Sequence, residues 1–287
     1  MNDTETQSQL RLAPIAALLC ALAVAPLVRA QGNPYFVVYD HHMEEPGNLE
    51  VALTSASASP KEGPRTLATN FEFEYGTTGW WTSALYLDGV STTDESTRFT
   101  GYRIENRFRL LMREHVVNPV FYIEYADTNG ADRIAKEIVG FDSWHDFTEP
   151  IGEAAEEKER ELETKLILSS NRRGWNFSAN AIGEKNLAGG PWEFGYAIGT
   201  NRPLALAAQP RQCLFCRENF VAGVELYGGA GEQHERTFAH TAHYIAPTVA
   251  WSLPNGITLR VSPGWGLTDV SNRSFVRFGI SFEGHIR

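Results

Sequence analysis

The feature that most constrains this chain is a strict alternation of charged and apolar residues within residues 97–128. Every second residue from Arg103 to Arg109 is charged, while the positions between them are mostly aromatic or aliphatic. The alternation resumes in residues 118–127 after a short break. Because successive side chains of a strand point to opposite faces of a sheet, this pattern predicts two neighbouring β-strands with one charged face and one apolar face.

Charged side chains of both signs recur on one face of most predicted strands. A membrane β-barrel with a polar interior requires charge facing inward and aromatic residues facing outward. The alternative is a soluble sheet with one solvated face. On the barrel interpretation, the candidate lumen-lining residues are Glu72, Glu74, Arg103, Glu105, Arg107, Arg109, Glu124, Glu163, Lys165, Glu225, Arg260 and Arg277.

The N-terminus has the pattern of an export signal. Residues 12–28 are almost entirely apolar and follow Arg11, and small residues precede an expected cleavage after Ala30. Residues 1–30 are therefore predicted to be a signal peptide, and Cys20 is lost with it. The alternative, a single N-terminal membrane anchor, needs a longer apolar run than this one, which proline interrupts.

The net charge restricts the class of protein further. The formal charge is -10 and the isoelectric point is near 5.3. Nucleic-acid binding relies on basic patches, so nucleic acid is not an expected partner. No second run of eighteen apolar residues follows the signal peptide. The remaining choices are a soluble exported protein and an outer-membrane barrel.

The mature chain divides into a lead-in and one domain. Residues 31–47 are expected to be a periplasmic lead-in, and residues 48–287 contain about twelve alternating segments near the length of a tilted membrane strand. The connections alternate between short and long, except that residues 201–218 are long where a short turn is expected. The acidic loop at residues 128–159 is expected to be partly helical, because its end is rich in good helix formers.

The pattern resembles Gram-negative outer-membrane β-barrel proteins, especially small monomeric barrels of about twelve strands. The final segment, residues 274–287, is an amphipathic strand, although the family's usual terminal aromatic is replaced by Arg287. Residues 40–47 and 75–81 also resemble uncharacterised predicted barrels. The resemblance implies an all-β, antiparallel up-and-down barrel in the outer membrane. It further implies contact with lipid, lipopolysaccharide and the barrel-assembly machinery, and it implies no activity.

The densest set of potential metal ligands is His41, His42, Glu44 and Glu45. Imidazole and carboxylate together suit a divalent transition metal such as zinc, copper or nickel. The alternative is a flexible polar segment, with no cofactor bound.

Cys213 and Cys216 form a CxxC pair in an exported chain. The oxidising periplasm favours a disulfide between them. A joint metal site with the histidine and glutamate cluster is the alternative, because both lie on the same predicted side of the membrane.

The sequence therefore predicts a channel or uptake protein for a small solute. The alternatives are a metal-associated envelope protein and a purely structural closed barrel, because inward charges of both signs can also pair and fill the lumen. A lipid-modifying hydrolase is a further alternative. Its candidate residues are His240, His243, Ser83, Ser178 and Ser252, and no spacing selects a nucleophile among them.

Overall fold

The computed structural model describes residues 32–59, 64–93, 97–132, 138–141, 150–206 and 213–286. The predicted signal peptide at residues 1–30 lies outside these ranges. Within them, no helix is long and apolar enough to cross a membrane.

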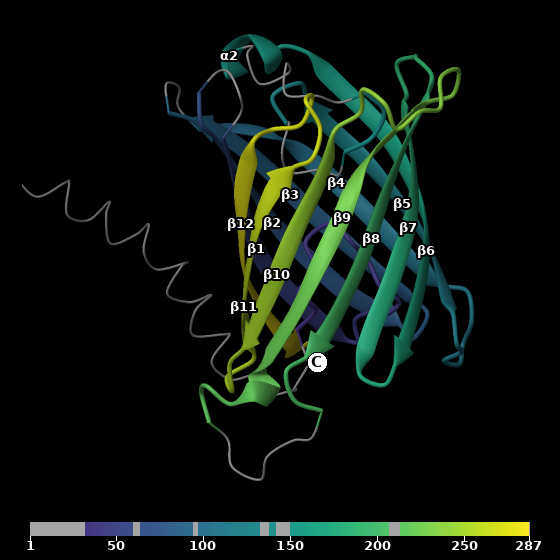
Figure 1. Cartoon of the computed structure of the whole chain (residues 1–287), viewed down its shortest axis with the longest axis vertical. Helices are drawn as coiled ribbons and strands as arrows, with labels where there is room; N and C mark the ends of the chain where they lie inside the picture. Colours follow the sequence, from purple (N-terminus) through teal and green to yellow (C-terminus); the bar gives the residue numbers. More distant parts are fainter. Residues whose placement is uncertain are drawn as a thin grey trace, which may run out of the picture.

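The described residues form twelve strands in one closed antiparallel barrel (Figure 1). Each strand pairs with its neighbours in sequence, and β1 pairs with β12 to close the wall. This confirms the predicted all-β up-and-down barrel. The strands are β1 (Asn48–Ser59), β2 (Thr66–Thr78), β3 (Trp81–Thr92), β4 (Arg98–Arg109), β5 (Asn118–Asn129), β6 (Lys158–Arg172), β7 (Trp175–Asn186), β8 (Trp192–Pro203), β9 (Phe220–Glu232), β10 (His243–Ser252), β11 (Ile257–Gly266) and β12 (Ser274–His285).

The wall is apolar outside and charged inside. Phe71 on β2 and Phe278 on β12 are 49% and 55% exposed, whereas Glu105 on β4 is fully buried. The period of two in a strand places alternate residues on opposite faces, so the alternation in the sequence becomes this separation. A surface in water would not gather aromatic and aliphatic side chains in this way, whereas a lipid-facing wall requires them.

The two ends of the barrel differ in their connections. At the lower end in Figure 1, where β12 ends, the β8–β9 connection is the longest and contains the 3-10 helix η2 (Arg217–Asn219). At the upper end, the β5–β6 connection contains α2 (Ile151–Ala154). The helical stretch expected near the end of the acidic loop is thus four residues long. A turn follows at residues 155–157, and β6 begins at Lys158.

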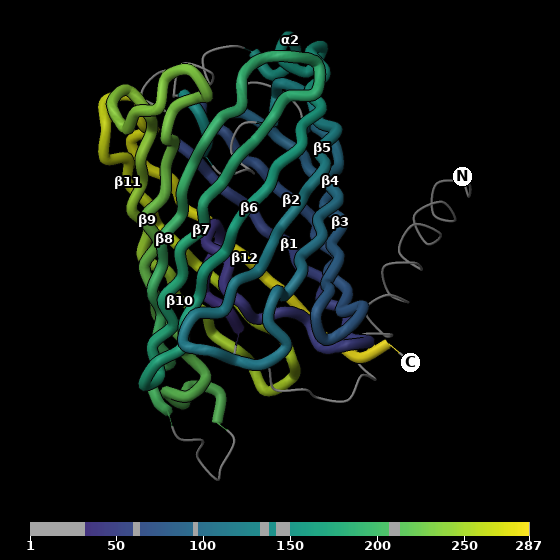
Figure 2. The backbone as a smooth tube through the Cα atoms, turned by 90° about the vertical axis from the view of Figure 1, so that its right-hand side faces the viewer, coloured from purple at the N-terminus to yellow at the C-terminus, as the bar shows by residue number. Residues whose placement is uncertain are grey.

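Residues 32–47, called the plug below, run inside the barrel, as the purple trace in Figures 1 and 2 shows. Tyr35, Val37 and Val38 are buried in one apolar cluster with wall residues such as Tyr244. Val139, from the β5–β6 connection, joins the same cluster. The segment expected to be a periplasmic lead-in therefore occupies the lumen, where its apolar side chains find a surface to bury against.

Candidate functional site

The plug is held by a buried carboxylate on β9. Glu225 is fully buried, and its Oε1 accepts hydrogen bonds from the backbone N–H groups of Phe36, Val37 and Val38 at 3.1, 2.8 and 2.8 Å. Bonds from amides to an ionised acceptor are about twice as strong as neutral ones. A segment without a strand partner thus has its amide groups satisfied by one side chain of the wall.

Other wall residues bind the plug along its length. The side-chain amide of Asn180 accepts from the N–H of Tyr39 at 2.7 Å and donates to its carbonyl at 2.9 Å. Arg109 donates to the carbonyl of His41 at 3.2 Å. All of these contacts are side chain to backbone, so the plug can leave without breaking the hydrogen bonds between strands.

Beside the plug, buried charges pair across the β2–β6 side of the lumen. Arg103 binds Asp88 at 2.8 Å and lies 3.4 Å from Glu124. Arg107 bridges Glu74 and Glu105. Each guanidinium is thus neutralised by two carboxylates, which an ion inside a narrow barrel requires.

Lys165 on β6 continues this network towards the plug. Its ammonium group lies 3.0 Å from Glu163 and is 4.4 and 4.1 Å from the ring centroids of Tyr39 and Tyr122. The aromatic faces attract the cation in a site shielded from water. Tyr39 therefore connects the plug to the charged wall.

The inward glutamates form one row across neighbouring strands, called the glutamate row below. Directly opposed residues of paired strands share a face, so the whole row faces inward with Glu105. Ala84 takes the position on β3. In register order from β12, the members are Glu283, Glu50, Glu74, Glu105, Glu124, Glu163, Glu184, Glu193 and, on β9, Glu232.

Strand tilt turns the glutamate row into a climbing path. Barrel strands tilt against the axis, so a line perpendicular to them rises around the wall. The row starts near the end of β12, at the lower end of the barrel, and reaches the start of β8 at the upper end. Sequence reasoning did not select Glu50, Glu184 and Glu193 for the lumen, because register between strands is not visible in one strand's pattern.

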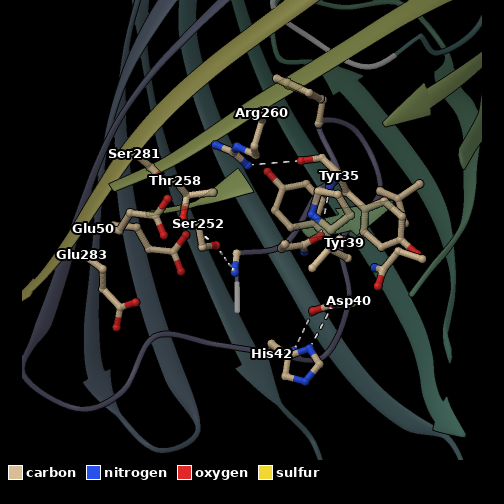
Figure 3. A pocket seen from close by; sticks show the side chains of 18 of the residues that line it. Tyr35, Tyr39, Asp40, His42, Glu50, Ser252, Thr258, Arg260, Ser281 and Glu283 are labelled. Carbon is tan, nitrogen blue, oxygen red and sulfur yellow. Dashed lines mark hydrogen bonds and ion pairs between the residues drawn. The ribbon is translucent and has the colours of Figure 1, made fainter. Parts of the chain in front are cut away.

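A cavity of about 910 Å³ separates the plug from the walls around β1, β2, β11 and β12. Glu50 and Glu283 line its lower part, and Arg260 reaches across it to the carbonyl of Tyr35 (Figure 3). Three predicted lumen residues border this cavity without belonging to the paired network of Arg103 and Arg107: Glu72, Arg260 and Arg277.

The predicted metal ligands do not converge. His41 Nδ1 lies 2.7 Å from the Ser169 hydroxyl, whereas His42 pairs with Asp40 at 3.0 Å. Glu44 lies near the glutamate row instead, and no group of three or more potential ligands occurs in the described part of the chain. These histidines serve the docking of the plug in this structure.

Cys213 and Cys216 are joined by a disulfide in the β8–β9 connection. Asn219 donates to the carbonyl of Cys213 at 2.6 Å, and the indole of Trp251 donates to the carbonyl of Leu214 at 2.9 Å. The disulfide and these two bonds fix the long connection against the lower end of β10.

The candidate catalytic residues are also apart. His243 binds the hydroxyls of Tyr196 and Thr241 at 3.0 and 2.9 Å. None of Ser83, Ser178 and Ser252 has a hydrogen bond to either candidate histidine within the described ranges. The Ser178 hydroxyl lies within hydrogen-bond distance of the Ser169 hydroxyl and the Asn176 side-chain oxygen instead, at 3.0 and 2.9 Å.

Comparison with solved structures identifies the class of fold. No known protein family and no curated protein matches the sequence. Among solved structures, an outer-membrane channel from Pseudomonas putida F1 aligns over 85% of this chain and 97% of its own, with 9% identity and a TM-score of 0.51. The NanC porin aligns over 83% and 100%, with 10% identity and a TM-score of 0.47. The KdgM porin aligns over 81% and 98%, with 8% identity and a TM-score of 0.43.

The fold is that of the outer-membrane β-barrels, as the P. putida channel shows. Within that class, this chain is a barrel of twelve strands with a charged lumen and an internal N-terminal plug.

Proposed function

We propose that this protein is an outer-membrane channel for a small polar solute, and that the plug controls passage. The observation that carries the proposal is the placement of charge inside and apolar surface outside, around a cavity of about 910 Å³. A polar lumen inside an apolar wall gives a solute a path through the bilayer. The predicted contacts with outer-membrane lipid, lipopolysaccharide and the assembly machinery belong to this proposal, as does a monomeric state.

The construction of the plug supports control of passage. Residues 32–42 contain no strand and bind the wall through side chains such as Glu225 and Asn180. Their departure leaves the closed sheet intact, because the barrel's own ladders involve only wall strands. The alternative with support from the same contacts is a closed structural barrel, in which the plug never leaves.

Conductance distinguishes the two functions. The mature protein is first checked in the outer-membrane fraction by its change in gel mobility on heating, and is then inserted into planar bilayers. A channel gives discrete current steps that increase when the plug is weakened. A protein that is correctly folded and gives no current, with or without the plug, is a structural barrel.

Docking of the plug is expected to weaken from pH 7 to pH 9. Burial, with the charges of Glu50 and Glu283, raises the pKa of Glu44 to about 9, although Arg107 acts in the opposite direction. The docked plug therefore keeps a proton that the released plug loses, and a rising pH favours release by at most about tenfold per pH unit. Bilayer conductance measured at both pH values should rise.

Glu44→Gln is the control for this prediction, because the amide keeps the shape and does not titrate. The pKa of His41 is lowered, mainly by burial, so its titration favours docking as the pH rises and acts against the effect of Glu44. The pKa of His42 is raised by its bond to Asp40, so loss of its proton acts in the same direction as Glu44. An unchanged pH response in Glu44→Gln would contradict the assignment to Glu44.

A further inference from the structure

Two lumen arginines beside the cavity form no ion pair within 4 Å with a carboxylate of the described residues. Arg103 and Arg107 each contact two carboxylates within 4 Å. Arg260 on β11 and Arg277 on β12 form no ion pair with any residue that the structure describes. Removing an ionised group from water costs several kcal/mol unless it is compensated. Glu72 acts on Arg260 and Glu225 on Arg277 only from beyond ion-pair distance, so each guanidinium has donor groups available for a ligand.

Arg277 is buried and has an unused donor. Its side chain is 7% exposed, and its guanidinium lies 5.3 and 4.9 Å from the ring centroids of Tyr227 and Phe275. Its Nη1 has no hydrogen-bond partner in the described ranges, although it borders the cavity. The charge of Glu225 on β9 acts on Arg277, but the two side chains form no ion pair within 4 Å. Its Oε1 accepts from the plug amides, and its Oε2 has no hydrogen-bond partner in the described ranges. These two rings lie beside the guanidinium and leave its Nη1 without a hydrogen-bond partner in the described ranges.

Arg260 extends into the same cavity. Its Nη1 donates to the carbonyl of Tyr35 at 3.2 Å, and the guanidinium lies 5.4 Å from the ring centroid of Phe36. Its Nε is buried, with no hydrogen-bond partner within the described chain. The register pairs Arg260 with Gly279, which lies two residues from Arg277 on β12. Such diagonal neighbours have Cα atoms about 7–8 Å apart, within reach of one ligand for two long side chains.

The adjoining wall leaves space and offers polar groups. The register row of Arg260 continues through Gly279 to Thr54 and Asn70. The row of Arg277 continues through Ala56 and Ala68, whose small side chains keep the cavity open. All four wall residues of β1 and β2 line the cavity, and the Asn70 Oδ1 is a buried atom without a hydrogen-bond partner among the described residues.

We propose that Arg260 and Arg277 form a binding site for a small hydroxylated carboxylate inside the lumen. This inference rests on the proposed function and names its substrate class. The carboxylate accepts hydrogen bonds from the two guanidinium groups, and Asn70 and Thr54 meet the hydroxyls. Arginine is suited to this task because its planar set of donors matches a carboxylate. The cavity of about 910 Å³ is within the range of small-molecule sites.

The test uses gluconate and sorbitol as probes. Gluconate has a carboxylate where sorbitol has an alcohol group. Binding of each is measured by calorimetry on the folded, mature barrel in detergent. Gluconate is expected to bind at one site, and sorbitol to bind at least about tenfold more weakly, because a hydrogen bond to a charged group contributes about 1.5–3 kcal/mol. Equal binding of the two probes, or no binding of gluconate, would overturn the proposal without any variant.

Variants then locate the site. Arg260→Gln and Arg277→Gln should each weaken gluconate binding, whereas Arg202→Gln should not. Arg202 is the matched control because its guanidinium also lies over an aromatic ring, that of Trp175, while Arg202 itself does not line the cavity. Each variant must retain its change in gel mobility on heating. Gluconate binding that persists in both folded variants would place the site elsewhere and refute the assignment.

Failure of the channel and failure of the site give different results. Gluconate binding in detergent without any bilayer current would support the binding site and refute the channel function. Current without gluconate binding would support the channel function and refute the binding site. In a conducting barrel, the reversal potential in a gradient of sodium gluconate should indicate anion preference, and Arg277→Gln should reduce it.

Discussion

Deletion of residues 32–42 is expected to raise the single-channel conductance several-fold. This part of the plug occupies the lumen with Tyr35, Val37, Val38 and Tyr39, and the wall contacts it through side chains alone. Its removal exposes the charged face of the wall to water, and the closed sheet of strands β1 to β12 is retained. The measurement is the current step of the deletion variant against the complete mature chain in the same bilayer.

A substitution outside the deleted segment gives an independent version of this result. A Cβ on Gly76 would overlap the backbone oxygen of Glu45, so Gly76→Ala must displace the end of the plug. Gly79→Ala is the matched control, because a Cβ there meets no atom within 4 Å. Gly76→Ala should increase the frequency of open events, while Gly79→Ala should behave as the unmodified protein.

Unchanged conductance in both plug variants would show that the plug is not the barrier. The inner part of the β5–β6 connection would then be the next candidate, since Val139 packs in the same apolar cluster and Gly140 donates to the carbonyl of Phe194. This outcome would remove plug control from the proposed function.

The sequence was sufficient to predict the wall of the barrel but not the plug inside it. The alternation around Arg103 and Glu105 can be recognised within a single strand. The number of strands, the closure of the barrel and its charged interior therefore follow from patterns that are local in sequence. The position of the plug inside the lumen does not follow from these local patterns. Tyr35 and Val37 belong to a short apolar run, and whether such a run stays outside or packs in a lumen depends on wall residues such as Glu225, distant in sequence.

The two arginines of the proposed anion site show the same limit. Arg260 and Arg277 were predicted to face inward, as were Arg103 and Arg107. Only the register between strands determines which of the four acquire carboxylate neighbours. That register places Asp88 and Glu124 beside Arg103 and places Gly279 and Ser262 opposite the other two.

Arg103→Met is expected to lower the free energy of unfolding by about 3–5 kcal/mol, the cost of breaking a buried ion pair by removing one partner. Arg103 is 4% exposed, and its partners Asp88 and Glu124 are 1% and 4% exposed. The substitution leaves both carboxylates without their cation in a place that water reaches poorly. Unfolding by urea in detergent, followed by the change in gel mobility on heating, measures the loss.

Arg160→Met is the matched control for this prediction. Arg160 forms an ion pair with Asp127 at 3.2 Å, but the Arg160 side chain is 58% exposed. An exposed pair contributes about 1 kcal/mol or less.

Adding Asp88→Asn to Arg103→Met should restore part of the stability, since it removes one of the two carboxylate charges that lack a cation. Equal, small losses in Arg103→Met and Arg160→Met would show that water solvates the carboxylates around Arg103. The lumen would then be open to solvent beside the plug, and the charged wall would contribute to conduction without contributing to the stability of the barrel.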